Sequence, residues 1–192
     1  LDYPKKGQVL FNGENIKKKG SNYHRRHHVS LVFQNYNLID YLTPLENVRL
    51  VNKNPDRKIL SELGLDEKQI NRNVLQLSGG QQQRVWIAMA LAQKTPYLLL
   101  DEPTTYLDIR YQLELLRLLK EINQKYKITI IMVLHDINQA IQYSNHIIGM
   151  KQGQIIVEGK AKDIMNQEVI KKIYGIDLQT TIINDQTYVL TV

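Results

Sequence analysis

The sequence predicts an α/β fold in which the strands of a parallel sheet are joined by helical crossovers. Tyr97 to Leu100 is short and continuously apolar, which is typical of a strand covered on both faces, and Ile128 to Leu134 is the following strand. Between the two, Leu115, Leu118 and Leu119 recur at helical spacing. Strand, helix and strand in succession favour a parallel sheet, because the crossover helix returns the chain to the edge from which it started.

A second helix precedes the first of these strands. Val85, Ala88, Met89 and Ala92 follow the spacing of one helical face, and they predict a helix that begins near Gln82. This helix extends the alternation of helices and strands toward the N-terminus, which strengthens the α/β interpretation.

The front of the chain contains a predicted hairpin and a further strand. Asn12-Gly13 suits the positive backbone dihedral angles of a two-residue turn, so we expect the residues on either side to pair. Val29 to Phe33 is the next strand. The polar stretch after it, punctuated by prolines such as Pro44, predicts a small inserted helical subdomain over about residues 36–95.

Two further hairpins are predicted at the end of the chain. Ile147 to Lys151 should pair with Gln154 to Glu158, and Thr180 to Ile183 should pair with Thr187 to Thr191. In both cases a short polar turn separates two apolar runs. We therefore expect a C-terminal β/α extension over about residues 147–192.

The composition is that of an ordinary globular domain. Of the 192 residues, 43% are hydrophobic and 23% are charged, and the absence of cysteine excludes disulfides and thiol chemistry. Apolar runs are much shorter than the roughly 20 residues needed to span a bilayer. The net charge of +6 includes basic stretches at Lys17 to Lys19 and His24 to His28. We interpret these as solvated surface, since no nucleic-acid recognition pattern or set of metal ligands accompanies them.

Two adjacent glycines stand where the helix near residue 82 is predicted to begin. Ser78 can cap this helix, while Gly79 and Gly80 allow the backbone to approach a ligand closely. The free N–H groups and the dipole of a helix N-terminus attract negative charge such as a phosphate. A pair of glycines before a helix is usually only a turn, so this pattern gains meaning from its companions.

Two carboxylates and one histidine follow the predicted strands. Asp101 and Glu102 come directly after the first, at the end of a parallel strand where open sheets present ligand-binding groups. His135 follows the second strand and precedes a helix indicated by Ile137 and Ile141. Each has an ordinary reading, as solvated acids in a turn or as a structural histidine. Their order along the chain is what distinguishes the sequence.

Together, Leu77-Ser78-Gly79-Gly80-Gln81, the stretch from Leu98 to Glu102 and His135 resemble the motifs of the ABC-type ATPase family. The resemblance implies a P-loop NTPase-like parallel sheet core, so that residues 1–192 would form a partial nucleotide-binding domain. It also implies ATP and Mg²⁺ as cofactors and ATP hydrolysis, coupled to transport, as the reaction.

The resemblance assigns chemistry to residues near the ends of the strands. Asp101 would hold Mg²⁺, directly or through water, and Glu102 would act as general base on the attacking water. His135 would contact the γ-phosphate and help to arrange that water. Gln34, just after the predicted strand at residues 29–33, would sense Mg²⁺ and link the site to membrane subunits.

The remaining motif residues imply a dimer at a membrane. In this family the stretch of Ser78, Gly79, Gly80 and Gln81 contacts the γ-phosphate of nucleotide held by the opposite subunit, and Asp108 lies in a loop through which the subunits communicate. The implied partners are a second ATP-binding subunit, transmembrane permease subunits and, indirectly, a substrate-binding protein, with no nucleic acid. The implied location is the cytoplasmic face of the cell membrane.

The phosphate-gripping loop of the family, of the form G-x-x-x-x-G-K-S/T, does not occur in the 192 residues. The resemblance places it before Leu1, together with the aromatic residue that stacks on adenine. We therefore expect an N-terminally truncated domain that binds ATP poorly by itself.

The chain resembles two subfamilies in two parts. Residues 82–174 are similar to the ATPases of iron-siderophore (ferrichrome-type) importers, whereas residues 1–77 are similar to the ATPases of peptide or lipoprotein exporters. The changeover suggests a hybrid reading frame joined around residues 77–85, a stretch that both subfamilies nearly share. The stretches that carry the two resemblances are Arg84 to Gln93, Pro103 to Ile109 and Leu134 to Ala140 for the importers, and Val32 to Ile39 and Leu42 to Val48 for the exporters.

The function that this resemblance favours is an ATP-binding and ATP-hydrolysing subunit that drives iron-siderophore import. One alternative is the ATPase of a peptide or lipoprotein exporter. Another is an inactive hybrid fragment that binds a complete ATPase and lends it the stretch at residues 78–81. An ABC ATPase that acts on DNA or ribosomes is disfavoured, because such proteins carry long coiled-coil inserts or tandem units that the sequence lacks.

Overall fold

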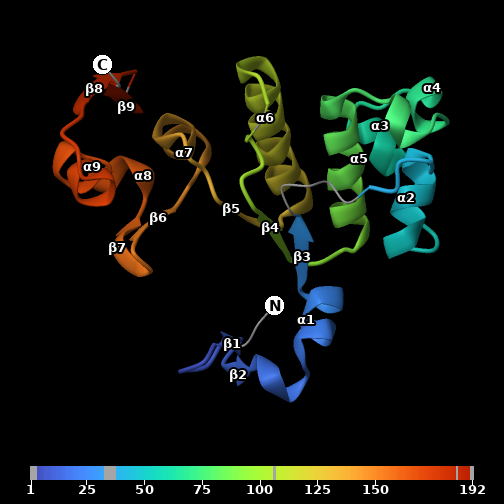
Figure 1. Ribbon diagram of the computed structural model, residues 1–192, viewed down its shortest axis with the longest axis horizontal. Coiled ribbons are helices and arrows are strands. Elements are labelled where there is room, and N and C mark those ends of the chain that lie inside the picture. The colour runs from blue at the N-terminus through green and yellow to red at the C-terminus, as the bar shows by residue number, and fades with distance from the viewer. Residues whose placement is uncertain (1–3, 33–37, 106, 185, 191–192) are drawn as a thin grey trace. The chain divides into compact units, whose positions relative to one another are not determined.

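The structure is a computed structural model that describes residues 4–32, 38–105, 107–184 and 186–190 (Figure 1). The chain divides into two compact units, Leu1–Val133 and Leu134–Val192. Each unit has its own hydrophobic core.

A three-stranded parallel sheet lies at the centre of the first unit. Its strands are β3 (Val29–Val32), β4 (Tyr97–Leu100) and β5 (Thr129–Met132), in the order β3-β4-β5. Leu100 of β4 pairs with Val32 on one side and with Met132 on the other, so the three strands end level with one another. The predicted α/β fold with a parallel sheet is confirmed, and whatever follows these strands lies along one edge of the sheet.

The expected burial of β4 on both faces is wrong for the described residues. Leu98 and Leu100 are buried, but Leu99 on the other face is only half-buried. On β5, which is an edge strand of the described sheet, Ile131 remains 52% exposed. The cause is that the core of this unit packs on one face of the sheet, so the apolar side chains of the opposite face meet solvent. The strand β5 is also shorter than the predicted run of residues 128–134.

The helix α5 (Gly79–Ala92) runs through the core of the first unit. Val85, Ile87 and Ala88 are fully buried, and Trp86 nearly so, because the helical layer covers one side of α5 and the sheet the other. The helix begins three residues before the predicted start at Gln82, since a polar cap precedes it. The other helical elements of this region are α2 (Pro44–Val51), α3 (Lys58–Glu62), α4 (Glu67–Ile70) and the 3-10 turn η2 (Val74–Gln76).

A buried asparagine holds the segment before α2 in place. The side chain of Asn47 accepts a hydrogen bond from the Ile39 amide (2.8 Å) and donates to the Ile39 and Thr43 carbonyls (3.2 and 3.1 Å). Asn47 is completely buried, so losing any of these partners would leave a polar group unpaired in the core. This network of hydrogen bonds fixes the position of the segment that leads into α2.

The predicted N-terminal hairpin is present. The strands β1 (Leu10–Phe11) and β2 (Glu14–Asn15) pair antiparallel, and Asn12 and Gly13 both have positive φ, as the turn requires. The ring of Phe11 lies edge-on to Tyr97 at the start of β4, which ties the hairpin to the sheet. The next elements are the 3-10 turn η1 (Ile16–Lys18) and α1 (Ser21–His27), and α6 (Ile109–Tyr126) follows β4.

Among its described residues, the second unit contains the two predicted C-terminal hairpins and three helices. An asparagine on its first helix extends the edge of the last strand: the Asn138 side chain donates to the Val189 carbonyl (3.0 Å) and accepts from the Val189 amide (2.8 Å). The hairpin partners are thus anchored to a helix. The elements of this unit are α7 (Ile137–Tyr143), β6 (Ile147–Lys151), β7 (Gln154–Gly159), α8 (Ala161–Ile164), α9 (Gln167–Tyr174), β8 (Gln179–Ile183) and β9 (Gln186–Leu190).

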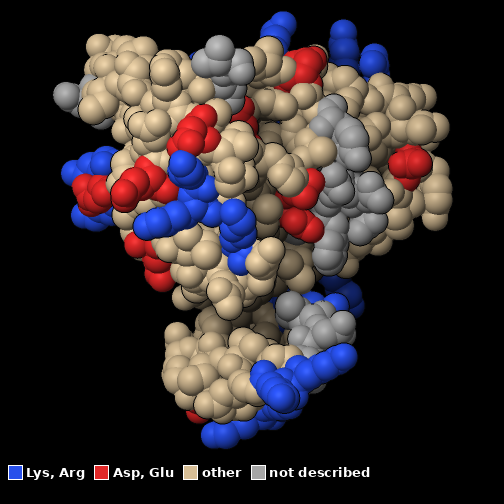
Figure 2. All heavy atoms as spheres, turned by 60° about the vertical axis from the view of Figure 1, so that its left-hand side comes forward, with Lys and Arg blue, Asp and Glu red and all other residues tan. Residues whose placement is uncertain are grey.

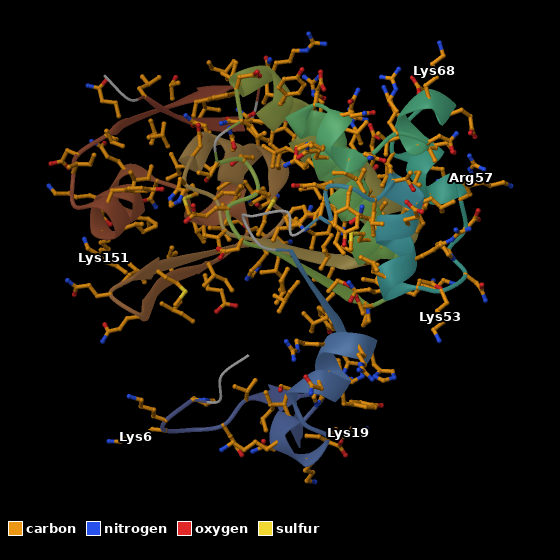
Figure 3. The ribbon with its side chains drawn as sticks, turned by 45° about the vertical axis from the view of Figure 1, so that its right-hand side comes forward. Lys6, Lys19, Lys53, Arg57, Lys68 and Lys151 are labelled. Atoms are coloured by element: carbon orange, nitrogen blue, oxygen red, sulfur yellow. The ribbon has the colours of Figure 1, made fainter. Side chains whose placement is uncertain are left out.

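Basic side chains are distributed over many elements. Lys6 and Lys19 lie in the N-terminal segment, and Lys53 and Lys68 lie beside and on the helical layer, as Figure 3 shows. Lys151 lies on β6, where its Nζ donates to the Lys172 carbonyl (2.9 Å). On the face seen in Figure 2, blue side chains form several separate groups, and red ones alternate with those of the upper groups. Across the described ranges, no helix has both the length and the apolar character needed to cross a bilayer.

The cap of α2 makes a testable contribution to stability. Thr43 and Glu46 form a capping box in which the Thr43 amide donates to Glu46 Oε2 (2.8 Å) and the Glu46 amide donates to Thr43 Oγ1 (3.3 Å). Thr43→Ala should lower the free energy of unfolding at pH 7 by about 1 kcal/mol. Urea denaturation followed by fluorescence of Trp86, the single tryptophan, reports on this unit.

The same cap predicts a pH dependence. The hydrogen bonds from Thr43 lower the pKa of Glu46 in the folded state. A depressed carboxyl pKa contributes stability above the unfolded value of about 4.3, and this contribution is lost as the pH falls through the folded pKa. The difference in stability between Glu46→Gln and the unmodified chain should therefore be larger at pH 7 than at pH 3. A difference of equal size at both pH values would contradict this account.

Candidate functional site

Asp101 and Glu102 lie at the C-terminal edge of the sheet, directly after β4. Asp101 is exposed and Glu102 is half-buried. Glu102 has φ of +48°, a left-handed conformation that costs a non-glycine residue roughly 1–2 kcal/mol. The turn is closed by Thr105, whose amide donates to the Glu102 carbonyl (3.2 Å) and whose hydroxyl donates to Glu102 Oε2 (3.2 Å). A costly backbone conformation therefore fixes the direction in which this carboxylate leaves the strand.

Two glutamines hold the loop that contains these carboxylates. Gln83 of α5, itself buried, donates from Nε2 to the Pro103 carbonyl (3.0 Å). Gln112 of α6 donates to the carbonyls of Thr104 (3.2 Å) and Leu107 (3.0 Å). Sequence reasoning missed both glutamines. No distinct signal in the sequence marks Gln83, because Gln81, Gln82 and Arg84 beside it on α5 are polar as well.

The N-terminus of α5 is closed by a reciprocal cap. Ser78 Oγ accepts from the Gln81 amide (3.4 Å), and Gln81 Oε1 accepts from the Ser78 amide (2.9 Å). The predicted capping role of Ser78 is confirmed, and the side chain of Gln81 completes the box. Ser78 and Gly79 are exposed, so the first turn of the helix remains accessible.

The surroundings of the two glycines in this turn differ, so glycine is favoured at only one of the two positions by packing within the chain. A Cβ atom on Gly80 would lie 3.2 Å from the ring of Tyr111, which is tighter than ordinary contact, so packing favours glycine there. A Cβ on Gly79 would meet nothing within 4 Å. Neither φ nor a neighbouring atom of the described chain requires glycine at position 79. A requirement at Gly79 would have to come from a group outside the chain that approaches the backbone closely.

Asp108 caps α6 and is linked to the glycines through a single residue. Its carboxylate accepts from the Tyr111 amide (3.1 Å), while the Tyr111 ring lies against Gly80. The loop at residues 101–108 and the start of α5 are therefore brought together within the first unit. A small cavity lies between the N-terminal parts of α5 and α6 and is lined by residues that include Ser78, Gln81 and Tyr111.

The other two predicted site residues cannot be placed in this arrangement. His135 is exposed and belongs to the second unit, next to Asp136, which caps α7 by accepting from the Asn138 (2.8 Å) and Gln139 (3.0 Å) amides. Gln34 lies outside the described residues.

The described donors suit one kind of metal ion better than others. Within the part of the chain that the structure describes, no group of three or more histidine or carboxylate side chains is positioned to hold an ion. This excludes a protein cage of the zinc type there. Mg²⁺ is bound through one or two carboxylates together with substrate phosphates and water, so the exposed Asp101 alone fits it.

Comparison with known proteins connects these features to one family. The profile described as "ABC transporter" matches residues 1–105. The iron(3+)-hydroxamate import ATP-binding protein FhuC of Bacillus subtilis (strain 168) is 49% identical over 128 residues, which cover 65% of this chain and 47% of FhuC. The ferric enterobactin transport ATP-binding protein FepC of Escherichia coli (strain K12) is 50% identical and is covered over 42% of its length. The chain thus spans less than half the length of these two relatives.

A longer match and two solved structures support the same relationship. The achromobactin transport ATP-binding protein CbrD of Dickeya dadantii (strain 3937) is 36% identical over 91% of this chain and 69% of its own length. A dimeric ATP-binding cassette bound to ADP and phosphate has a TM-score of 0.68 and 34% identity, with 83% of this chain and 75% of that chain covered. CbiO1 from Clostridium perfringens has a TM-score of 0.74 at 31% identity, with 88% and 72% covered.

The left-handed conformation of Glu102 predicts that two substitutions at this position will differ in their effect on stability. Glu102→Gly and Glu102→Ala both remove the carboxylate and its bond to Thr105, but only glycine relieves the strain at φ of +48°. The glycine variant should therefore be more stable than the alanine variant by roughly 1 kcal/mol. Urea denaturation monitored by Trp86 fluorescence compares the two. Equal stabilities would show that the turn relaxes without cost.

Proposed function

Since this chain belongs to the ABC transporter family, we propose that it is an ATP-binding and ATP-hydrolysing subunit that energises iron-siderophore import. The relatives that are 49% and 50% identical over the shared region are named for import of iron(3+)-hydroxamate and transport of ferric enterobactin. The front part of the chain, with its likeness to peptide or lipoprotein exporters, keeps an export ATPase as the alternative.

The observation that carries the proposal is the loop after β4. A strand of the parallel sheet delivers Asp101 and Glu102 to the edge where such sheets bind ligands, and two glutamines from α5 and α6 hold the loop. Glu102, set by its left-handed backbone, would act as general base on the attacking water. Glu102 would thus accept a proton from the water at its carboxylate.

Asp101 would hold Mg²⁺, with Gln34 as a further contact by resemblance to the family. When bound, Mg²⁺ would neutralise charge on the phosphates of ATP. The exposure of Asp101 supports this role, because phosphates must reach the ion from outside the fold. His135, exposed before α7, would contact the γ-phosphate and orient the water.

The start of α5 would serve nucleotide on a second ATP-binding subunit. Ser78 and Gly79 are exposed, and the free space at Gly79 leaves room for a phosphate to approach the backbone amides. Gly80 would shape this turn by leaving room for the Tyr111 ring. Gln81 would shape it by accepting the hydrogen bond that completes the cap. Asp108 is connected to Gly80 through Tyr111. It would transmit the nucleotide-bound state of one subunit to the other.

The further partners in this proposal are transmembrane permease subunits and, through them, a substrate-binding protein. The corresponding location is the cytoplasmic face of the cell membrane. The described helices include none that could span a bilayer, so association with the membrane would go through the permease. The region around residues 36–95 would form the helical subdomain, and residues 147–192 a C-terminal extension.

The proposal is tested by adding the phosphate loop that the 192 residues lack. The chain is purified by itself and with a G-x-x-x-x-G-K-S/T segment of a related ATPase joined before Leu1. The extended protein should hydrolyse ATP, and Glu102→Gln should lower its kcat by about 10²–10⁴-fold, because the general base is lost. Glu121→Gln, an exposed change of the same kind on α6, is the control and should leave kcat unchanged.

The direction of transport needs a separate experiment. The extended protein is expressed in a bacterium whose own siderophore-import ATPase has been deleted, and uptake of ⁵⁵Fe-labelled hydroxamate siderophore is measured. Restored uptake that depends on Glu102 supports import. Turnover of ATP without uptake favours the exporter alternative. If neither protein turns over ATP, but the 192-residue chain stimulates a complete ATPase when mixed with it, the fragment that binds another ATPase is the better interpretation.

A further inference from the structure

We propose that a cavity of about 650 Å³ at the opposite edge of the sheet binds a small amphipathic anion, a carboxylate or phosphate ester with an apolar body. The cavity lies where β4 and β5 begin, lined by Pro96 and Ile128, and it is bordered by the ends of α5 and α6. The carboxylates Asp101 and Glu102 follow the other end of β4. Four strand residues, each rising about 3.3 Å, separate the cavity from them.

The interior of the cavity is mainly apolar. Ile59 of α3, Leu91 of α5 and Leu98 of β4 contribute to its lining, together with Ile128. Its volume is within the range of roughly 300–1,000 Å³ that is usual for small-molecule sites. An apolar body of eight to ten carbon atoms therefore has both the space and the surroundings that it needs.

Three lysines surround this apolar interior. Lys125 pairs with Glu62 (Nζ to Oε2, 2.7 Å), and Glu62 also accepts from the Tyr126 hydroxyl. Lys94 and Lys127 take part in no ion pair within the described ranges. The two acids of the lining are both engaged, Glu62 as described and Asp56 by the amide that follows it two residues later. A hydrogen bond from an amide leaves Asp56 negatively charged, so the lining carries three lysines against two carboxylates and keeps a net charge of +1 to attract an anion.

The backbone of these two lysines is unusual. Lys94 and Lys127 follow the ends of α5 and α6 with φ of +53° and +54°. Glycine is the common residue at such positions, because a Cβ atom makes the left-handed conformation costly. A helix dipole favours a cation anywhere in the last turn, but it does not require that the strained position itself be lysine. Both strained lysines line the same cavity, which points to a shared task there.

A bound anion would also connect two parts of the unit. The cavity lies between α3 of the helical layer and the end of α6, and the ion pair of Glu62 and Lys125, both in its lining, already joins these two helices. Filling it would add apolar contacts to both sides, and the carboxylate or phosphate would pair with Lys94 and Lys127. Binding should therefore raise the thermal stability of the first unit.

The test uses decanoate, decyl phosphate and decanol as probes. Decanoate and decyl phosphate should bind saturably to the 192-residue chain by isothermal titration calorimetry and raise its Tm. Decanol, which has the same apolar body without the charge, should bind at least tenfold more weakly. The ratio of the two anion affinities distinguishes a carboxylate site from a phosphate site. Equal binding of decanol and the anions would overturn the proposal, because apolar burial alone would then explain it.

Matched variants assign the charge to the two lysines. Lys94→Gly with Lys127→Gly removes both cations and relieves both left-handed conformations, so this variant should fold at least as well, yet bind decanoate at least tenfold more weakly. Lys68→Gln with Lys120→Gln changes the net charge equally at exposed positions away from the cavity lining and should bind like the unmodified chain; Lys68 points outward from α4 in Figure 3. Unchanged affinity in the glycine variant would refute the assignment.

Discussion

The burial of one helix is the constraint on which the first unit depends. From Val85 to Ala92 the helix α5 is apolar on all sides, and such a stretch is stable only where it is covered on every side. The helical layer covers one side and the sheet the other, with Ser30 of β3 donating to the Ala90 carbonyl (3.0 Å) in the buried contact. The side chain of Gln83 on this helix donates to the Pro103 carbonyl. The position of the loop after β4 therefore depends on the same packing.

The periodicity of the chain predicted most of this architecture, since apolar spacing depends on whether a residue faces a core. The parallel strands, α5 and the hairpins were predicted within a few residues of their observed bounds. The polar contacts were not predictable in the same way. The side chains of Gln83, Gln112 and Asn47 form hydrogen bonds with backbone groups. Every residue has such groups, so no sequence pattern identifies the one that is bound. Only the tertiary approach of two segments reveals such a partner.

The candidate site divides along the same line. Asp101, Glu102 and Ser78 could be chosen from sequence because their motifs combine residue type with position at the end of a strand or the start of a helix. The positive φ of Glu102 could not, because any residue type can be forced into that region by a tight turn. The exposed face of β5 was also missed: a continuous apolar run indicates that a strand is made to be covered, and the described residues leave Ile131 uncovered.

That uncovered face bears on the fate of the chain in a cell. Ile131 of β5 and Val133, which directly follows this strand, are each 52% exposed. Exposed β-branched side chains at an edge strand are the kind of surface to which other unpaired strands attach. Where nothing shields this strand, copies of the chain compete for it. Attachment of one copy to another through this strand would therefore increase with the concentration of the chain.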